Sequence, residues 1–164
     1  MGDNFKYMVE KDKKSFFIGC EPYLNGVANL ISILNPKDYE RIKIYEKDVR
    51  WLLELLPMSF FSKIIILFPD PWKKRRHKKR RLFNTSNINH FLKKLKNDGE
   101  IYFGTDVEDY FYEVKDYFAK KNKDFTILNK NDFFRKPSLL YLTKYAKKSI
   151  KKGFSPLYLV VKKK

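Results

Sequence analysis

Residues 63–72 read Lys-Ile-Ile-Ile-Leu-Phe-Pro-Asp-Pro-Trp, and this stretch decides the fold. Its apolar run is typical of a strand that is buried on both faces of a parallel sheet. Pro69 and Pro71 fix φ and predict an extended turn at the rim of that sheet. The turn would present the Asp70 carboxylate beside the ring of Trp72. Such a pair could hold a flipped purine by stacking and by accepting its exocyclic hydrogens.

Outward from this strand, short strand-like runs alternate with longer helical stretches. The predicted strands cover residues 15–21, 41–48, 63–70, 100–106, 125–129 and 157–161. The predicted helices cover residues 22–34, 49–56, 82–97 and 107–120. This alternation predicts an α/β fold with an open, mostly parallel sheet and helices on both faces. A length of 164 residues predicts one domain over 1–164.

Acidic residues follow four consecutive predicted strands. They are Glu21, Asp48, Asp70 and Asp106. Acids also favour strand ends and helix N-caps, so one such residue would carry no functional meaning. Ligands of open α/β sheets bind beyond the carboxyl ends of the strands. We therefore interpret the four acids as one rim of a binding site rather than as caps.

The formal net charge of +17 is concentrated in two segments. Residues 73–81 and residues 141–164 each hold eight Lys or Arg and no acid, whereas the rest of the chain has 20 basic and 19 acidic residues. Two compact basic segments indicate a polyanion such as nucleic acid. A lysine-rich composition or a nuclear-localisation-type address is the simpler alternative. Neither explains why residues 63–72 come directly before the first segment.

The composition also argues against several classes of protein. A single cysteine, Cys20, excludes an internal disulfide framework and a cysteine zinc site, and predicts a cytoplasmic protein. No apolar run approaches the roughly 20 residues that a membrane span requires. We therefore expect no membrane association and no metal, and leave open whether the chain is a monomer or a homodimer.

Phe68–Trp72 followed by KKRRHKKRR closely resembles the tRNA (guanine-N7-)-methyltransferases of the bacterial type. The resemblance covers essentially the whole chain. Its further matches, in order, are the IGCE stretch ending at Glu21, the acid Asp48, Gly104-Thr105-Asp106 and Thr143-Lys144-Tyr145.

This resemblance implies a Rossmann-like fold, S-adenosylmethionine as cofactor, and methylation of N7 of a guanine in the tRNA variable loop. By position, Glu21 resembles the acid that holds the cofactor ribose, Asp48 the acid near its adenine, and Asp70 the central catalytic or cofactor-contacting acid. The positions that match the tRNA side are Lys74, His77, Arg80, Asp106, Thr143, Lys144 and Tyr145. Because guanine N7 carries a free lone pair, we expect Asp70 to position groups rather than to accept a proton.

The chain departs from the family pattern in two places. Gly2-Asp3 resembles the tail of the family's glycine-rich loop, so the first strand and most of that loop are expected to be absent. Either translation is assigned from an internal Met, or the gene is split or decaying. Ala146 stands where the family has Glu. The alternative functions are therefore an impaired remnant or split half that binds tRNA without methyl transfer, and a basic nucleic-acid binder unrelated to methyl transfer.

Overall fold

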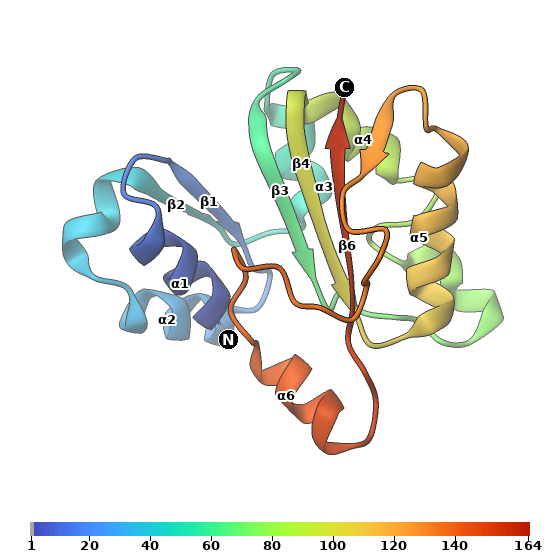
Figure 1. Cartoon of the computed structure of the whole chain (residues 1–164). Helices are drawn as coiled ribbons and strands as arrows, with labels where there is room; N and C mark the ends of the chain where they lie inside the picture. Colours follow the sequence, from blue (N-terminus) through green and yellow to red (C-terminus); the bar gives the residue numbers. More distant parts are fainter. Residues whose placement is uncertain (1) are drawn as a thin grey trace. The chain divides into compact units, whose positions relative to one another are not determined.

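The computed structural model describes residues 2–164, which form two compact units, each with its own sheet (Figure 1). The smaller unit runs to Leu55 and includes Ser138–Lys144. The larger unit comprises Leu56–Pro137 and Tyr145–Lys164. The single domain over 1–164 stays a prediction.

The smaller unit is built on two parallel strands. Its elements are α1 (Asp3–Lys11), β1 (Phe17–Cys20), α2 (Leu24–Ile33), the 3-10 helix η1 (Pro36–Arg41), β2 (Ile42–Tyr45) and α3 (Val49–Leu55). Phe17 lies opposite Ile42 and Cys20 opposite Tyr45. The core consists of Val9 of α1, Leu30 of α2, Leu34 directly after α2, and Ile42 of β2. The predicted helices over 22–34 and 49–56 are confirmed.

Arg41 fastens the end of α1 to this unit. Its guanidinium donates to the backbone oxygen of Asp12 at 2.7 Å, and also to that of Val9. Asp38 accepts from its Nε at 3.0 Å. These bonds satisfy carbonyl groups that a helix leaves without partners at its C-terminus. Arg41 comes directly before β2, so these bonds join the start of that strand to the end of α1.

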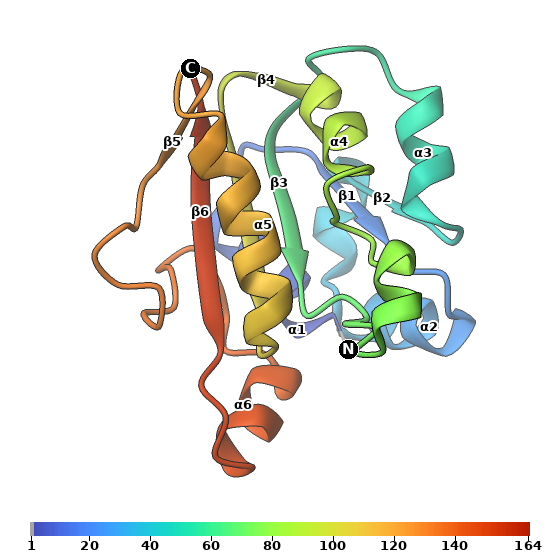
Figure 2. The same cartoon turned by 90° about the vertical axis from the view of Figure 1, so that its right-hand side faces the viewer.

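The larger unit holds a four-stranded sheet in the order β3-β4-β6-β5. Its elements are β3 (Phe61–Leu67), the 3-10 helix η2 (Arg75–Arg80), α4 (Ile88–Lys94), β4 (Leu95–Thr105), α5 (Glu108–Lys120), β5 (Phe125–Ile127), α6 (Lys144–Lys151, of which Lys144 belongs to the smaller unit) and β6 (Leu157–Lys163). Figure 2 shows α5 lying along one face of this sheet.

The larger sheet is only partly parallel. β3 and β4 run parallel, with Leu67 beside Gly104. β6 returns antiparallel to β4, with Thr105 opposite Leu157, and β5 is antiparallel to β6. The prediction of a mostly parallel sheet is therefore wrong for β5 and β6, whose pairings are antiparallel. Because β6 runs opposite to β3 and β4, it begins at the carboxyl end of these two strands and ends at their amino end.

The predicted helix over 82–97 is wrong at both ends. Residues 82–87 form turns that the Asn84 side chain fixes by accepting from the N–H groups of Ser86 and Asn87. At the other end, Leu95 is fully buried as the first residue of β4. The spacing of Leu95 from the apolar residues before it fits the end of a helix, but a buried leucine also fits the start of a strand. Helix α6 has no counterpart among the predicted elements, whereas the predicted helix over 107–120 is confirmed as α5.

Candidate active site at the carboxyl end of the larger sheet

The turn after β3 is held in an unusual backbone conformation. Phe68 and Trp72, at its two ends, have φ values of 50° and 42°. This left-handed region costs a non-glycine residue of order 1 kcal/mol or more, so it persists only where surrounding contacts fix it. One such contact is the bond from the Phe68 N–H to the Gly104 carbonyl, at 2.7 Å. The two prolines between these residues limit the remaining freedom of the turn.

Arg81 is the main brace of this turn. Its side chain is fully buried, and its Nε donates to the Pro71 carbonyl at 2.8 Å. Its other nitrogens donate to Asp109 and Glu113 of α5, each at 2.6 Å. The guanidinium also lies over the ring of Tyr110, 4.6 Å from its centre. One arginine thus joins the turn after β3 to the helix after β4.

The charges of this brace stabilise one another. Hydrogen bonds from Lys78 and then Arg81 hold the pKa of Asp109 below its ordinary value. Burial alone would lower the pKa of Arg81, but its bonds to Asp109 and Glu113 outweigh that effect and raise it. Asp109 and Arg81 therefore stay ionised near neutral pH, and the hydrogen bond between them is of the stronger, charge-assisted kind.

Trp72 gathers two residues of the basic segment. The Arg80 guanidinium lies over its ring at 5.1 Å from the centre, and the His77 ring meets it edge-on at 5.8 Å. His77 and Arg80 lie on η2, which the bond from the His77 N–H to the Lys74 carbonyl helps to close. Two predicted tRNA-side residues, His77 and Arg80, therefore meet the ring of Trp72, and the third, Lys74, lies at the start of the same short helix.

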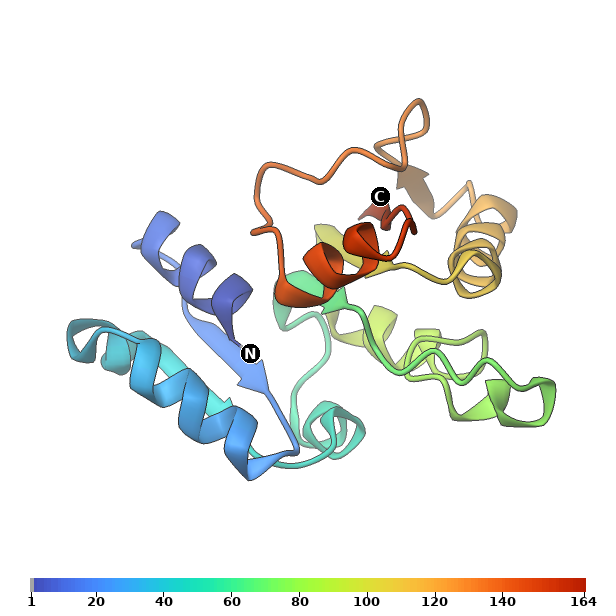
Figure 3. The same cartoon turned by 90° about the horizontal axis from the view of Figure 1, so that it is seen from below.

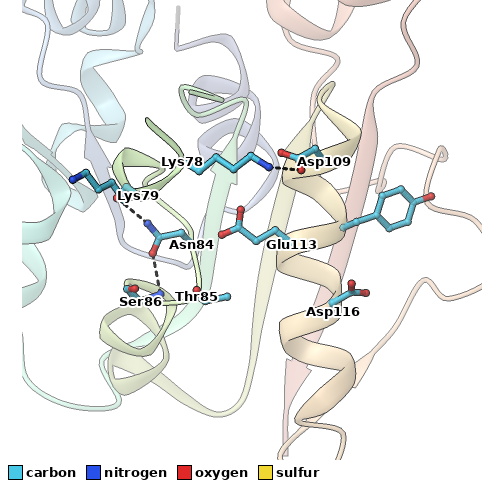
Figure 4. Close-up of a pocket in the computed structure, with 9 residues that line it drawn as sticks. Lys78, Lys79, Asn84, Thr85, Ser86, Asp109, Glu113 and Asp116 are labelled. Carbon is cyan, nitrogen blue, oxygen red and sulfur yellow. Dashed lines mark hydrogen bonds and ion pairs between the residues drawn. The ribbon is translucent and has the colours of Figure 1, made fainter. Parts of the chain in front are cut away.

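An open pocket of about 780 Å³ lies between this basic segment and α5 (Figure 4). One wall holds Lys78, which pairs with Asp109, and Asn84, which donates to the Lys79 carbonyl. The opposite wall is the acidic side of α5, with Glu113 and Asp116. Its lining is polar and mixed in charge, so its geometry favours no single ligand.

Asp70 and Asp106 follow the two parallel strands of the larger sheet. Asp70 is exposed in the braced turn, and Asp106 comes directly after β4. Both acids therefore lie beyond the carboxyl ends of neighbouring strands in this sheet. That all four acids form one rim of a binding site stays a prediction.

Glu21 and Asp48 occupy the equivalent places in the smaller unit. Glu21 comes directly after β1, and its Oε1 accepts from the Tyr23 N–H at 3.0 Å. Gly26, in the first turn of α2, makes room for this carboxylate, because a Cβ there would lie 2.7 Å from the Glu21 side chain. The Glu21 carboxylate is therefore held in place at the carboxyl end of its strand.

Asp48 is bonded to Arg50. Its Oδ1 accepts from the Arg50 N–H and Nε, each at 2.9 Å, and the side-chain bond lowers the pKa of Asp48. The Cys20 thiol lies close to both acids and donates to the Lys47 carbonyl. Although Cys20 is exposed as a residue, partial desolvation, with smaller contributions from Asp48 and Glu21, raises its pKa to about 11. Cys20 is thus a poor nucleophile at neutral pH.

The predicted C-terminal tRNA-side residues lie at the start of α6. Thr143 and Lys144 belong to the smaller unit and Tyr145 to the larger one. Tyr145 is exposed, whereas Ala146, the residue in place of the family Glu, is fully buried. Figure 3 shows α6, in orange-red, in front of the ends of β3 and β4.

The C-terminal basic segment does not form one surface. Lys147, Lys148, Lys151 and Lys152 lie on or just after α6, before β6 begins. Lys162–Lys164 lie where β6 ends, and Lys162 pairs in register with Glu100 at the start of the buried part of β4. These three lysines therefore lie at the opposite end of the larger sheet from residues 73–81, because β6 runs antiparallel to β4.

Sequence reasoning missed the groups that hold the turn. In the sequence, Arg81 stands out only as part of the basic segment 73–81, and its partners Asp109 and Glu113 carry no predicted role. Their four-residue spacing places both acids on one face of α5, which is the signal that could have found them.

The fold defines the class of protein. The structure is similar to the crystal structure of a SAM dependent methyltransferase from Archaeoglobus fulgidus, with a TM-score of 0.56 at 14% identity, over 99% of this chain and 83% of that one. At this identity the likeness establishes the fold, which is the predicted Rossmann-like methyltransferase fold.

The sequence comparisons define the family. A family model described as "Putative methyltransferase" matches residues 1–157. The tRNA (guanine-N(7)-)-methyltransferase of Chelativorans sp. is 35% identical over 96% of this chain and 68% of its own length. The chain therefore belongs to the tRNA (guanine-N7-)-methyltransferase family, as its motifs predicted. It is also 34% identical to the "Bifunctional methyltransferase" of Rickettsia conorii, of which it spans 31%.

Two features are absent from residues 2–164. No helix there is long and apolar enough to span a membrane. No group of three or more His, Cys, Asp or Glu there is arranged to hold a metal ion.

Proposed function

We propose that this chain transfers a methyl group from S-adenosylmethionine to N7 of a guanine in the variable loop of tRNA. The braced turn at Phe68–Trp72 carries this proposal. It places an exposed carboxylate at the carboxyl end of a parallel strand, beside an aromatic ring and an arginine-containing basic helix. This is the place where α/β sheets bind their ligands. The names of the relatives and the family membership support the same reaction.

The residues of the smaller unit suit the cofactor. The held carboxylate of Glu21 follows a parallel strand and can accept hydrogen bonds from a ribose diol. Asp48 follows the neighbouring strand, and its bonds to Arg50 keep it ionised as a second acceptor. S-adenosylmethionine, when bound, supplies an electrophilic methyl group. We assign Glu21 to the ribose and Asp48 to the adenine side.

The residues of the larger unit then bind and orient the RNA. Guanine N7 carries an in-plane lone pair and no proton at neutral pH, so the chain needs no general base to expose it. Asp70 positions the base and places negative charge beside a ring that becomes cationic. Lys74, His77 and Arg80 hold phosphate oxygens, with Arg80 pre-oriented on Trp72. Asp106 completes the RNA side of this unit. We assign Thr143 and Lys144 of the smaller unit, and Tyr145, to RNA contacts as well. Orientation of this kind can supply up to roughly 7–11 kcal/mol of the barrier.

The test is a methyl-transfer assay with labelled S-adenosylmethionine and an unmodified tRNA transcript, followed by mass spectrometry of the nucleosides. We expect 7-methylguanosine from the unaltered chain and about 100-fold less from Asp70→Asn, because misplacing the reacting groups has an effect of that order. Asp132→Asn, an exposed carboxylate in a loop of the same unit, is the matched control and should leave the product unchanged. A methylated nucleoside other than 7-methylguanosine would refute the proposal.

Ala146 favours a second candidate function, tRNA binding without methyl transfer. The residue is fully buried, so α6 presents no carboxylate at this position. This alternative predicts normal tRNA affinity, no 7-methylguanosine and no calorimetric binding of the cofactor. Detection of the methylated product in the same assay rejects it.

A further inference from the structure

Nine lysines occur in three stretches at the amino end of the larger sheet, the end opposite the candidate active site. The stretches are residues 93–100, 120–124 and 162–164. They also contain three acids, Asp98, Glu100 and Asp124. We call this group the amino-end lysine surface; its members are Lys93, Lys94, Lys96, Lys120, Lys121, Lys123, Lys162, Lys163 and Lys164. Positive charges outnumber negative ones threefold there.

Hydrogen bonds join the three stretches. Lys163 Nζ donates to the Leu95 carbonyl at 3.1 Å, which links the end of β6 to the start of β4. Lys164 Nζ donates to the Asn122 carbonyl at 2.7 Å, which links the same strand end to the turn after α5. In Figure 1 these segments lie together at the labelled C-terminus. The lysines therefore belong to one region of one unit.

The charge of this region is poorly neutralised by the protein itself. Within residues 2–164, Lys162 is the one member that pairs with a carboxylate, Asp98, at 3.0 Å. Lys94, Lys163 and Lys164 bond to carbonyl oxygens, which orient the ammonium groups without cancelling their charge. Like charges held together repel one another and attract a polyanion.

We propose that the amino-end lysine surface is a second phosphate-binding surface that contacts the sugar-phosphate backbone of RNA. For the identity of that RNA, tRNA, the inference rests on the proposed function. The surface holds lysines and no arginine, and lysine acts as a point charge without the geometric selectivity of a guanidinium. It therefore suits contacts that do not depend on sequence.

The separation of the two ends also suits one large RNA. At about 3.3 Å per residue, strand β3 spans roughly 20 Å from Phe61 to Leu67. A folded RNA that reaches from one end to the other makes its second contact at a high effective concentration. The amino-end lysine surface would thus add affinity and leave the chemistry to the other end.

An anionic membrane fits this region less well than RNA does. Peripheral membrane binding commonly uses an amphipathic helix with an apolar face. Here the lysines lie at helix ends, in a turn and at a strand end. The exposed Met58 and Phe60 lie close to Lys93, because the intervening Ser59 N–H donates to its carbonyl, so vesicle binding is included in the test.

The experiment compares two variants that each lose four positive charges. The test variant changes four exposed lysines of the surface, Lys93→Gln, Lys96→Gln, Lys120→Gln and Lys123→Gln. The control variant changes four exposed lysines elsewhere, Lys14→Gln, Lys37→Gln, Lys43→Gln and Lys130→Gln. Circular dichroism confirms that both fold. The affinity for a tRNA transcript is then measured by fluorescence anisotropy, without cofactor, between about 50 and 200 mM salt.

We expect the test variant to lower the slope of log affinity against log salt by about three, since each lost phosphate contact removes roughly 0.7–0.9. The control variant should keep the slope of the unaltered chain. Equal slopes for the two variants would overturn the inference. So would a test variant that loses binding to phosphatidylserine vesicles but keeps its tRNA affinity. Because no methyl transfer is measured, failure here leaves the proposed function standing, and absence of 7-methylguanosine leaves this inference standing.

Discussion

The two ends of the larger sheet carry similar positive charge but are built differently. At the carboxyl end, Arg80 stacks on Trp72, and the buried guanidinium of Arg81 bonds to two carboxylates and to a turn with two left-handed residues. At the amino end, lysines are anchored to carbonyl oxygens. Fixed geometry is what a reaction needs, whereas point charges without a defined geometry suffice to hold a phosphate backbone. Net charge alone therefore does not distinguish a catalytic surface from a surface that only binds a phosphate backbone.

The largest expected effect follows from removing Arg81, which braces the turn at the carboxyl end of the sheet. Arg81→Ala removes a buried guanidinium and leaves the Pro71 carbonyl and two carboxylates without it. We expect the free energy of unfolding to fall by about 2 kcal/mol, measured by urea denaturation. Arg80→Ala is the matched control. Arg80 is the adjacent residue and its side chain is exposed, so this change should alter the free energy of unfolding little. Equal midpoints for the two variants would show that Arg81 braces nothing.

A smaller effect should separate stacking from charge at the same end. Trp72→Ala releases Arg80 and His77, and we expect tRNA affinity to fall about two- to fivefold, corresponding to a cation–π contribution of roughly 0.5–1 kcal/mol. Trp72→Phe keeps a ring and should retain most of the affinity. In the double variant with Arg80→Ala the losses should be less than additive. Strict additivity would mean that Trp72 acts independently of Arg80.

The smallest expected effect concerns acidic pH. The pKa of Asp109 in the folded chain is lowered below its ordinary value of 3.8 by bonds from Lys78 and Arg81. Its contribution to stability is therefore complete above that value and lost as pH falls through the lower, folded pKa. The stability difference between the unaltered chain and Asp109→Asn should shrink as pH falls below about 4. A difference that stays constant down to pH 2 would contradict this account.

Much of the fold could be predicted from sequence because its signals are local. The run at 63–68 and the acids after four predicted strands indicated where these strands lie and where they end. The direction of β6 could not be predicted, because an apolar strand reads the same whether it pairs parallel or antiparallel. That one direction separates Lys162–Lys164 from the lysines of α6.

The candidate site was predicted in part for a similar reason. Asp70, His77 and Arg80 lie in one contiguous motif, so their proximity follows from the sequence. The bonds from Arg81 to Asp109 and Glu113 join residues 28 and 32 positions apart. The four-residue spacing of the two acids marks one face of α5, but which residue that face meets depends on how α5 lies beside the turn.

The most direct test of the division between the two ends is a side-by-side kinetic comparison. The rate of 7-methylguanosine formation is measured against tRNA concentration for Asp70→Asn and for the four-lysine variant of the amino-end lysine surface. The account predicts a lower kcat for Asp70→Asn, and a higher KM with unchanged kcat for the lysine variant. A lysine variant with a reduced kcat, or an Asp70→Asn chain with an unchanged kcat, would contradict it.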